Sequence, residues 1–246
     1  MMPIEIERGI KPRAQKILIY GQHGIGKTTL AAQFPGAVFI DTEDGTAGYD
    51  VARFPIPQTW NELLEEVAWA ARSGEVGTLV IDSMDWAERL CINALCIEKG
   101  KASIEDFGYG KGYVYLKDTF KRLLNGMDYC ISHGVNVVCT AHDQVTRIEQ
   151  PEEMASYSVY GLKLSKYIAP LLKEWADAVL YCHYKTVVVT DTSGKGHATG
   201  GTLRVIQCNH NAVIDAKNRW GMPDELPMSY DEIAKYFNGS EEKESE

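Results

Sequence analysis

The stretch Gly21-Gln22-His23-Gly24-Ile25-Gly26-Lys27-Thr28 decides the fold of this chain. It follows the apolar residues 17–20 and precedes the segment Thr29-Leu30-Ala31-Ala32, which predicts a strand, a glycine-rich loop and a helix in that order. Backbone N–H groups in such a loop can surround the phosphates of a nucleotide, because glycines allow close approach and unusual dihedral angles. The stretch therefore predicts a phosphate loop.

The pattern G-x-x-x-x-G-K-[ST] also assigns chemistry to its last residues. The Lys27 ammonium is expected to reach the β- and γ-phosphates, and the Thr28 hydroxyl is expected to bind Mg²⁺. The predicted cofactors are ATP and Mg²⁺. The predicted ATP-binding residues are Gly21, Gln22, His23, Gly24, Ile25, Gly26, Lys27, Thr28 and Thr29.

Composition indicates one globular α/β domain. The chain has 246 residues, 45% of them hydrophobic and 24% charged, which suits a single large core. No apolar run approaches the roughly 20 residues of a membrane span, and the first residues lack the apolar core of a signal peptide. We expect a cytoplasmic protein without membrane contact, in the host cytoplasm if a phage encodes it.

Charge and cysteine usage exclude some classes of protein. A net charge of −9 disfavours a non-specific duplex binder, although it permits a local basic channel. The six cysteines lie in apolar patterns without a C-x-x-C pair, which predicts buried, reduced thiols. A zinc site built from Cys182-His183 and Cys208-x-His210 is disfavoured, because alternate strand residues face opposite ways.

Acidic residues follow two predicted strands. The first strand, residues 37–40, leads into Asp41-Thr42-Glu43-Asp44-Gly45, where Glu43 could polarise the attacking water. The alternative is a solvated acidic turn that ends at Gly45. The second strand, residues 78–81, ends at Asp82, which we interpret as the Mg²⁺-binding aspartate rather than the N-cap of the next helix. The residue after Asp82 is Ser83, which offers no carboxylate as a catalytic base. Glu43 is therefore the better candidate for the base.

A third buried strand, residues 135–140, ends at Ala141-His142-Asp143. His142 is the candidate sensor of the γ-phosphate, and a structural hydrogen-bonding role is its alternative.

Residues 98–113 and 144–164 lack clear periodicity, and the first of these two segments suggests a nucleic-acid contact. The first mixes lysines with aromatic rings, which suits single-stranded DNA because cations contact phosphates and rings stack on bases. Six basic and three acidic residues between positions 99 and 122 give a local charge of +3. A plain surface loop is the alternative. The candidate DNA-binding residues of this first segment are Lys99, Lys101, Tyr109, Lys111 and Tyr113.

The remaining chain predicts a helix from residue 166 interrupted at Pro170, a strand over 178–183, and a β-hairpin formed by residues 185–190 and 202–207. The segment Lys217-Asn218-Arg219-Trp220-Gly221 follows, and a short helix over 230–237 closes the chain.

In this order the strand-end features resemble the RecA-like ATPase core, over roughly residues 14–225. Residues 39–43 resemble the RecA-family segment that carries the catalytic glutamate. In RecA relatives the segments that correspond to residues 98–113 and 144–164 bind single-stranded DNA, so the resemblance implies that Arg147 and Lys163 also bind DNA. The K-x-R of Lys217 and Arg219 is similar to that of DnaB-type helicases and RadA proteins, where both side chains reach the γ-phosphate of a neighbouring subunit. The resemblance implies a homo-oligomer, as a ring or filament, whereas a surface turn is the alternative. The implied catalytic residues are Glu43, Lys27, Lys217, Arg219 and His142.

The small core with the stretch Phe107-Gly108-Tyr109-Gly110-Lys111-Gly112-Tyr113 looks most like phage nucleotide-binding proteins, some of which are ATP-dependent single-strand annealing proteins. The expected partners are single-stranded DNA, further copies of the chain and a single-strand-binding protein. The chain departs from RecA at His142, where RecA has a glutamine, and it has no separate DNA-binding domain.

The expected fold is a mostly parallel central sheet flanked by helices with a C-terminal hairpin. The expected organisation is an N-terminal segment (1–13), an ATPase domain (14–238) and a disordered acidic tail (239–246). Three other functions stay open: a DnaB-like helicase or translocation motor, a nucleotide-dependent switch acting on a protein partner, and, as the weakest, a small-molecule kinase.

Overall fold

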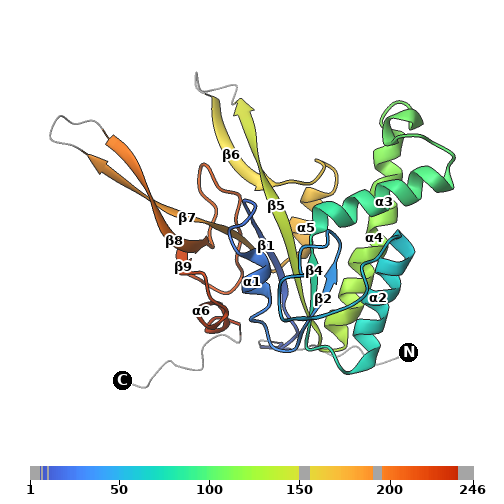
Figure 1. Cartoon of the computed structure of the whole chain (residues 1–246), viewed down its shortest axis with the longest axis horizontal. Helices are drawn as coiled ribbons and strands as arrows, with labels where there is room; N and C mark the ends of the chain where they lie inside the picture. Colours follow the sequence, from blue (N-terminus) through green and yellow to red (C-terminus); the bar gives the residue numbers. More distant parts are fainter. Residues whose placement is uncertain (1–5, 7, 10, 150–155, 191–195, 238–246) are drawn as a thin grey trace.

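Nine strands form one sheet in the computed structural model, which describes residues 6, 8, 9, 11–149, 156–190 and 196–237. The sheet order is β3-β2-β4-β5-β1-β7-β8-β9, and β6 pairs with β5. The first six of these strands run parallel, and only β6, β8 and β9 are added by antiparallel pairing. The predicted α/β fold with a mostly parallel sheet is therefore confirmed (Figure 1). The strands are β1 (Lys16–Gly21), β2 (Ala37–Asp41), β3 (Ala52–Arg53), β4 (Thr78–Asp82), β5 (Asn136–Glu149), β6 (Ser156–Leu162), β7 (Ala178–Thr190), β8 (Gly196–Gln207) and β9 (Glu225–Pro227).

Helices cover both faces of the sheet. Alternate residues of β1 face opposite ways, so Leu18 and Tyr20 pack in one apolar cluster and Ile17 and Ile19 in the other. The first cluster lies under the four larger helices, and the second lies under α1 and α6. The helices are α1 (Lys27–Ala31), α2 (Trp60–Ser73), α3 (Met84–Glu98), η1 (Ile104–Phe107, a 3₁₀ helix), α4 (Lys111–Ser132), α5 (Ala169–Trp175) and α6 (Tyr230–Ala234).

The expectation that residues 144–164 are irregular is wrong. Strand β5 continues to Glu149 and pairs antiparallel with β6, from Asp143 opposite Leu162 to Glu149 opposite Ser156. This hairpin extends beyond the core, so both of its faces meet solvent and the sequence shows no apolar alternation. Val145, for example, is 58% exposed.

The expectation that residues 98–113 are irregular is wrong at its end. Residues 104–107 form η1, and α4 begins at Lys111 after Gly110, which has the left-handed φ of 70°. A Cβ on Gly112 would lie 2.4 Å from the carbonyl oxygen of Ile104, so glycine allows η1 to pack directly on α4. The expected interruption at Pro170 is also different: the proline lies in the first turn of α5, where its missing N–H costs nothing.

Other expectations agree with the structure. All six cysteines are buried free thiols, as expected, and at the start of α2 the Thr59 hydroxyl accepts the Glu62 N–H. The C-terminal hairpin forms from β7 and β8, although β8 begins at Gly196 and not at residue 202 as expected, and residues 191–195 lie outside the described residues. The same holds for the acidic tail at 239–246 and for much of segment 1–13, so these boundaries stay predictions. Among the described helices, none has the length and apolarity to cross a membrane.

Three parts of the chain extend past the carboxyl ends of the parallel strands (Figure 1). They are the β5–β6 hairpin, the β7–β8 hairpin and the corner between α3 and α4. The loop between β1 and α1 lies at the same edge of the sheet, so a ligand there has all three projections on its side.

One acidic side chain makes stability depend on pH. Glu66 lines a cavity of about 660 Å³ beside Phe54 and Trp69, and burial, with the nearby Glu62 charge, raises the pKa of Glu66 to about 7. Folding therefore favours the neutral carboxyl. Its stabilising contribution is complete below the ordinary value of 4.5 and is lost as the pH rises through about 7.

We expect Glu66→Gln, which stays neutral, to raise the free energy of unfolding near pH 8 by about 1 kcal/mol relative to its effect near pH 4. The gain is smaller than the pKa shift alone would give, because the carboxyl is only partly buried. Urea denaturation at the two pH values measures it. The adjacent exposed Glu65→Gln is the matched control, and parallel pH profiles for wild type and Glu66→Gln would contradict the assignment.

Candidate nucleotide-binding site

The glycines of the loop between β1 and α1 serve different purposes. Gly26 has a φ of 106°, which side chains rarely adopt, and it begins α1. Gly21 is extended, but a Cβ there would lie 2.3 Å from the carbonyl oxygen of Cys182 on β7. The close approach of β7 to β1, rather than the approach of a phosphate, therefore requires glycine at position 21.

Lys27 lies inside this loop. Its ammonium donates to the carbonyl oxygens of Gly21 at 2.9 Å and Gln22 at 3.1 Å, and the residue is only 6% exposed. Burial lowers the pKa of Lys27, although the carboxylate of Asp82 opposes that effect. The loop thus holds a positive charge among backbone N–H groups, as phosphate binding requires.

Asp82, at the end of β4, accepts hydrogen bonds from one side chain of α1 and one of β5. Its carboxylate accepts a hydrogen bond from the Thr28 hydroxyl at 2.7 Å and another from the Thr140 hydroxyl on β5. Ser83, not Asp82, is the N-cap of α3, so the capping alternative for Asp82 does not hold. A hydroxyl and a carboxylate oxygen are ligands that suit Mg²⁺, and Thr28 and Asp82 would hold it.

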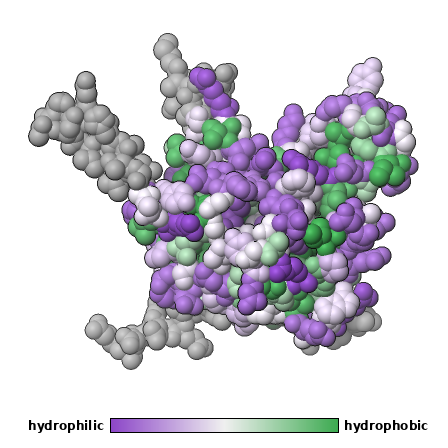
Figure 2. Space-filling model, viewed as in Figure 1, coloured by the Kyte–Doolittle hydropathy of each residue, from purple (hydrophilic) through white to green (hydrophobic). Residues whose placement is uncertain are grey.

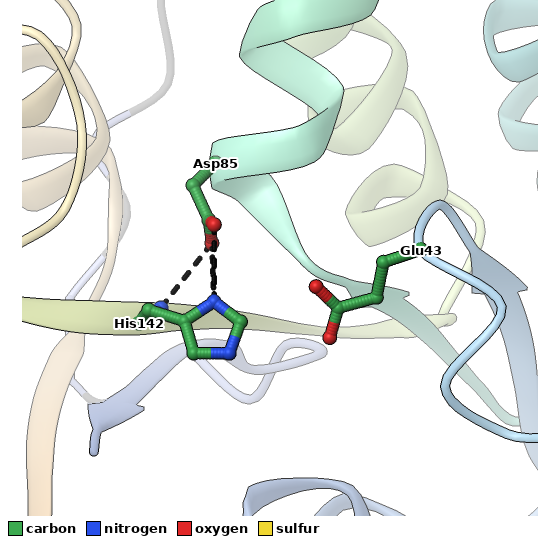
Figure 3. Close-up of side chains that lie close together, drawn as sticks. All are labelled: Glu43, Asp85 and His142. Atoms are coloured by element: carbon green, nitrogen blue, oxygen red, sulfur yellow. Dashed lines mark hydrogen bonds and ion pairs between the residues drawn. The ribbon is translucent and has the colours of Figure 1, made fainter. Parts of the chain in front are cut away.

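Glu43, Asp85 and His142 form a second cluster (Figure 3). The Nδ1 atom of His142 lies 3.0 Å from a carboxylate oxygen of Asp85, whose other oxygen accepts the His142 backbone N–H at 3.2 Å. The carboxylate of Glu43 points toward the same imidazole, and one potential ligand atom from each residue lies within 4.8 Å of the others. Asp85 therefore orients the His142 ring. This geometry agrees both with a γ-phosphate sensor and with a purely structural hydrogen-bonding role for His142.

The electrostatics of this cluster suit a base. Burial and the charges of Asp82 and Asp85 raise the pKa of Glu43, while His142 opposes the shift. Burial by itself would raise the pKa of Asp85, but hydrogen bonds from His142 hold the pKa of that carboxyl below its usual range. The Ser83 hydroxyl donates to Glu43 at 3.3 Å. The Asp41 carboxylate accepts the backbone N–H groups of Glu43 and Gly45, so the acidic turn is also present, and the catalytic role of Glu43 stays a prediction.

Two neighbouring cavities meet at these residues. The first, of about 310 Å³, contains Lys27, Thr28 and Asp82 and is also lined by Arg204 of β8. The second, of about 540 Å³, continues past His142 to Trp86, Arg89 and Lys163. Both cavities share His23, Glu43, Gly45 and His142.

Lys217 and Arg219 lie far from the phosphate loop of their own chain. Lys217 pairs with Val179, which is opposite Leu18 near the amino end of β1. Its ammonium donates to the Lys173 carbonyl at 2.9 Å and the Ala176 carbonyl at 2.6 Å, so it caps α5. Arg219 pairs with Asp177 at 3.0 Å. A role at a neighbouring subunit stays a prediction.

The candidate DNA-binding residues separate into groups. Tyr109 is fully exposed, whereas the half-buried Tyr113 stacks on Tyr167 at 4.4 Å and donates to Glu105, and a DNA contact at either residue stays a prediction. Lys99 pairs with Glu98 at 2.7 Å.

Lys101 lies over the Phe107 ring, and Lys111 begins α4. Arg147 is on the β5–β6 hairpin, while Lys163 lines the cavity beside His142.

Sequence reasoning missed three residues of the site: Thr140, Asp85 and Arg204. Thr140 ends the predicted strand 135–140, and Asp85 lies in the first turn of the helix that follows the predicted strand 78–81. Because these two strands are parallel neighbours, their carboxyl ends meet, and knowledge of that order would have placed both residues at the site. Arg204 lies in a hairpin whose register no local pattern reveals, and only the fold brings it to the loop.

The glycine-rich loop lies at the carboxyl ends of a parallel sheet, with the buried Lys27 inside it and Thr28 hydrogen-bonded to Asp82. These features define a P-loop NTPase domain. The AAA domain family matches residues 13–220, and the chain belongs to this family of nucleotide-binding ATPase domains. No curated protein matches the chain.

The Asp82 pairing makes a prediction for Thr140. Thr140→Val keeps the shape but removes one hydroxyl from the carboxylate, so we expect Asp82 to be less well oriented. The Mg²⁺ concentration that gives half-maximal ATP binding should rise about tenfold, the value of one hydrogen bond to a charged group. Titration of fluorescent ATP with Mg²⁺ measures this.

Thr78→Val is the matched control, because Thr78 is also fully buried and its hydroxyl donates to the Pro35 carbonyl at the other end of β4. Equal Mg²⁺ requirements for the two variants would contradict the role given to Thr140.

Proposed function

We propose that this chain is an Mg²⁺- and ATP-dependent ATPase that binds single-stranded DNA and anneals it in phage-type homologous recombination. The observation that carries the proposal is the continuity of β5. This one strand supplies Thr140 and His142 to the nucleotide site and then continues into the β5–β6 hairpin. A change at the nucleotide therefore has a direct structural route to a projecting surface.

The residues of the site suit hydrolysis of ATP to ADP and phosphate. Lys27 and the loop N–H groups hold the phosphates, and Thr28 with Asp82 would hold Mg²⁺, which neutralises phosphate charge when bound. Glu43 orients the attacking water and accepts its proton. Asp85 keeps the His142 ring at the side of Glu43, where it can respond to the γ-phosphate.

Cationic and aromatic groups next to His142 support contact with single-stranded DNA. The guanidinium of Arg89 lies 4.4 Å from the ring centre of Trp86, and both line the 540 Å³ cavity with Lys163. Trp86 is 39% exposed, so its ring is accessible to a base. Stacking rings beside phosphate-binding cations are the common elements of single-strand binding.

The corner between α3 and α4 offers a second surface of this kind. Tyr109 and Tyr115 are exposed there, and among the described residues Lys101 and Lys111 make no ion pair. Figure 2 shows apolar side chains beside hydrophilic ones over this corner, at the upper right. Such a mixture suits bases and phosphates together better than duplex DNA, which presents mainly phosphates.

The proposal includes a homo-oligomer. Arg219 lies at the amino ends of the strands, and its side chain is 56% exposed, so it can approach a phosphate only in a neighbouring subunit. Turnover per subunit should then rise with protein concentration. A single-strand-binding protein is the proposed partner that delivers the DNA.

The first test is Glu43→Gln. We expect this variant to bind Mg²⁺ and ATP like the wild type but to hydrolyse ATP about 10²–10⁴ times more slowly, because the base is lost. Asp44→Asn is the matched control: it is the adjacent, exposed carboxylate, and asparagine tolerates its φ of 59°. Steady-state ATPase assays with and without single-stranded DNA measure both.

Single-stranded DNA should stimulate the wild-type rate, and ATP should accelerate annealing of complementary strands. A rate indifferent to DNA, with Glu43→Gln unimpaired in function, would contradict the proposal in favour of a nucleotide-dependent switch. ATP-driven strand displacement without annealing would indicate a helicase.

A further inference from the structure

The β7–β8 hairpin brings an arginine to the phosphate loop of its own chain. A Cβ on Gly26 would lie 3.0 Å from a terminal nitrogen of Arg204 and 3.6 Å from the Met228 methyl carbon, so the guanidinium lies directly against the start of α1. Arg204 is opposite Tyr184, where the pairing of β7 with β8 shifts register before Thr186. Such irregularities re-aim side chains, and Arg204, in the last regular pair before the shift, carries the cation that faces the loop.

Arg204 is free to bind a ligand. Its guanidinium lies 5.9 Å from the Tyr184 ring centre, and within the described residues it forms no ion pair. Other arginines of the chain are engaged: Arg13 and Arg219 pair with Asp177, and Arg53 donates to the carbonyls of Thr46 and Tyr49.

The charge of the cavity shows why a second cation matters there. Among the lining groups, Asp82 and Glu43 carry carboxylates, against the single ammonium of Lys27 and the guanidinium of Arg204. A triphosphate adds further negative charge, so Lys27 alone would leave the loaded site strongly anionic. A guanidinium can also bond two phosphate oxygens at once, which an ammonium cannot do with the same geometry.

We infer that Arg204 binds the polyphosphate of the nucleotide within its own subunit. The role of Arg204 adds a phosphate-binding residue to the proposed ATPase site, and it rests on the proposed nucleotide binding at the loop. It makes the β7–β8 hairpin a second element, besides β5, that contacts the nucleotide. It also separates two cationic roles: Arg204 serves its own site, while Lys217 and Arg219 lie at the opposite end of the strands.

The test uses inorganic tripolyphosphate with Mg²⁺, which has phosphates but no base, beside a non-hydrolysable ATP analogue and the full chain. We expect Arg204→Ala to weaken the binding of both ligands about tenfold or more by calorimetry, as expected for a lost hydrogen bond to a charged group. Arg204→Lys should recover part of the loss. The control is Arg72→Ala, an exposed arginine on α2 outside the cavity.

Unchanged affinity for tripolyphosphate in Arg204→Ala would overturn the inference, and a loss seen only with the ATP analogue would assign Arg204 to the base instead. Circular dichroism and thermal unfolding of each variant exclude misfolding as the cause of a loss. Failure of the proposed function gives a different result: wild type would bind tripolyphosphate through Arg204 yet show no response to single-stranded DNA.

Discussion

The buried carboxylate of Asp82 is the constraint on which the rest of the site depends. A charge that is only 3% exposed must be satisfied by the protein, and two hydroxyls do so, Thr28 from the phosphate loop and Thr140 from β5. This arrangement ties the end of β4 to the first turn of α1 and to the neighbouring strand β5. The negative charge also opposes the effect of burial on Lys27 and contributes to the raised pKa of Glu43. The same carboxylate therefore holds the Thr28 hydroxyl in place and acts electrostatically on both Lys27 and Glu43.

Parallel strands place their carboxyl ends at one edge of the sheet, and the two hairpins and the α3–α4 corner all extend from this edge (Figure 1). Strand β5 passes from Thr140 and His142 directly into its hairpin with β6, and β7 passes into the hairpin that carries Arg204. Two projections thus share residues with the nucleotide site, and both are shown on the same side of the sheet in Figure 1. Side chains with two contacts, such as His142 between Asp85 of α3 and His23 of the phosphate loop, can report the state of one part to another.

The sequence predicts the central half of the fold well, because glycine, lysine and threonine at this fixed spacing after an apolar strand are typical of a phosphate loop. Asp82 and Glu43 also follow from their places after apolar strands. The β5–β6 hairpin could not be predicted, since its two exposed faces remove the alternation that marks a strand. Tyr113 shows a second limit: exposed and packed aromatic residues look alike in a glycine-rich segment, and only the fold places its ring on Tyr167. Arg204 reaches the loop through long-range pairing, which no local pattern records.

We propose that the state of the nucleotide is transmitted along β5 to its hairpin. This can be followed by amide hydrogen exchange of the full chain with an Mg²⁺-bound non-hydrolysable ATP analogue, with ADP and without nucleotide. Exchange at residues 143–147 and 158–162 should be slower with the ATP analogue than with ADP, because the γ-phosphate would engage His142 at the base of the hairpin. Equal exchange of these residues in the two nucleotide states, with protection confined to the phosphate loop, would contradict it.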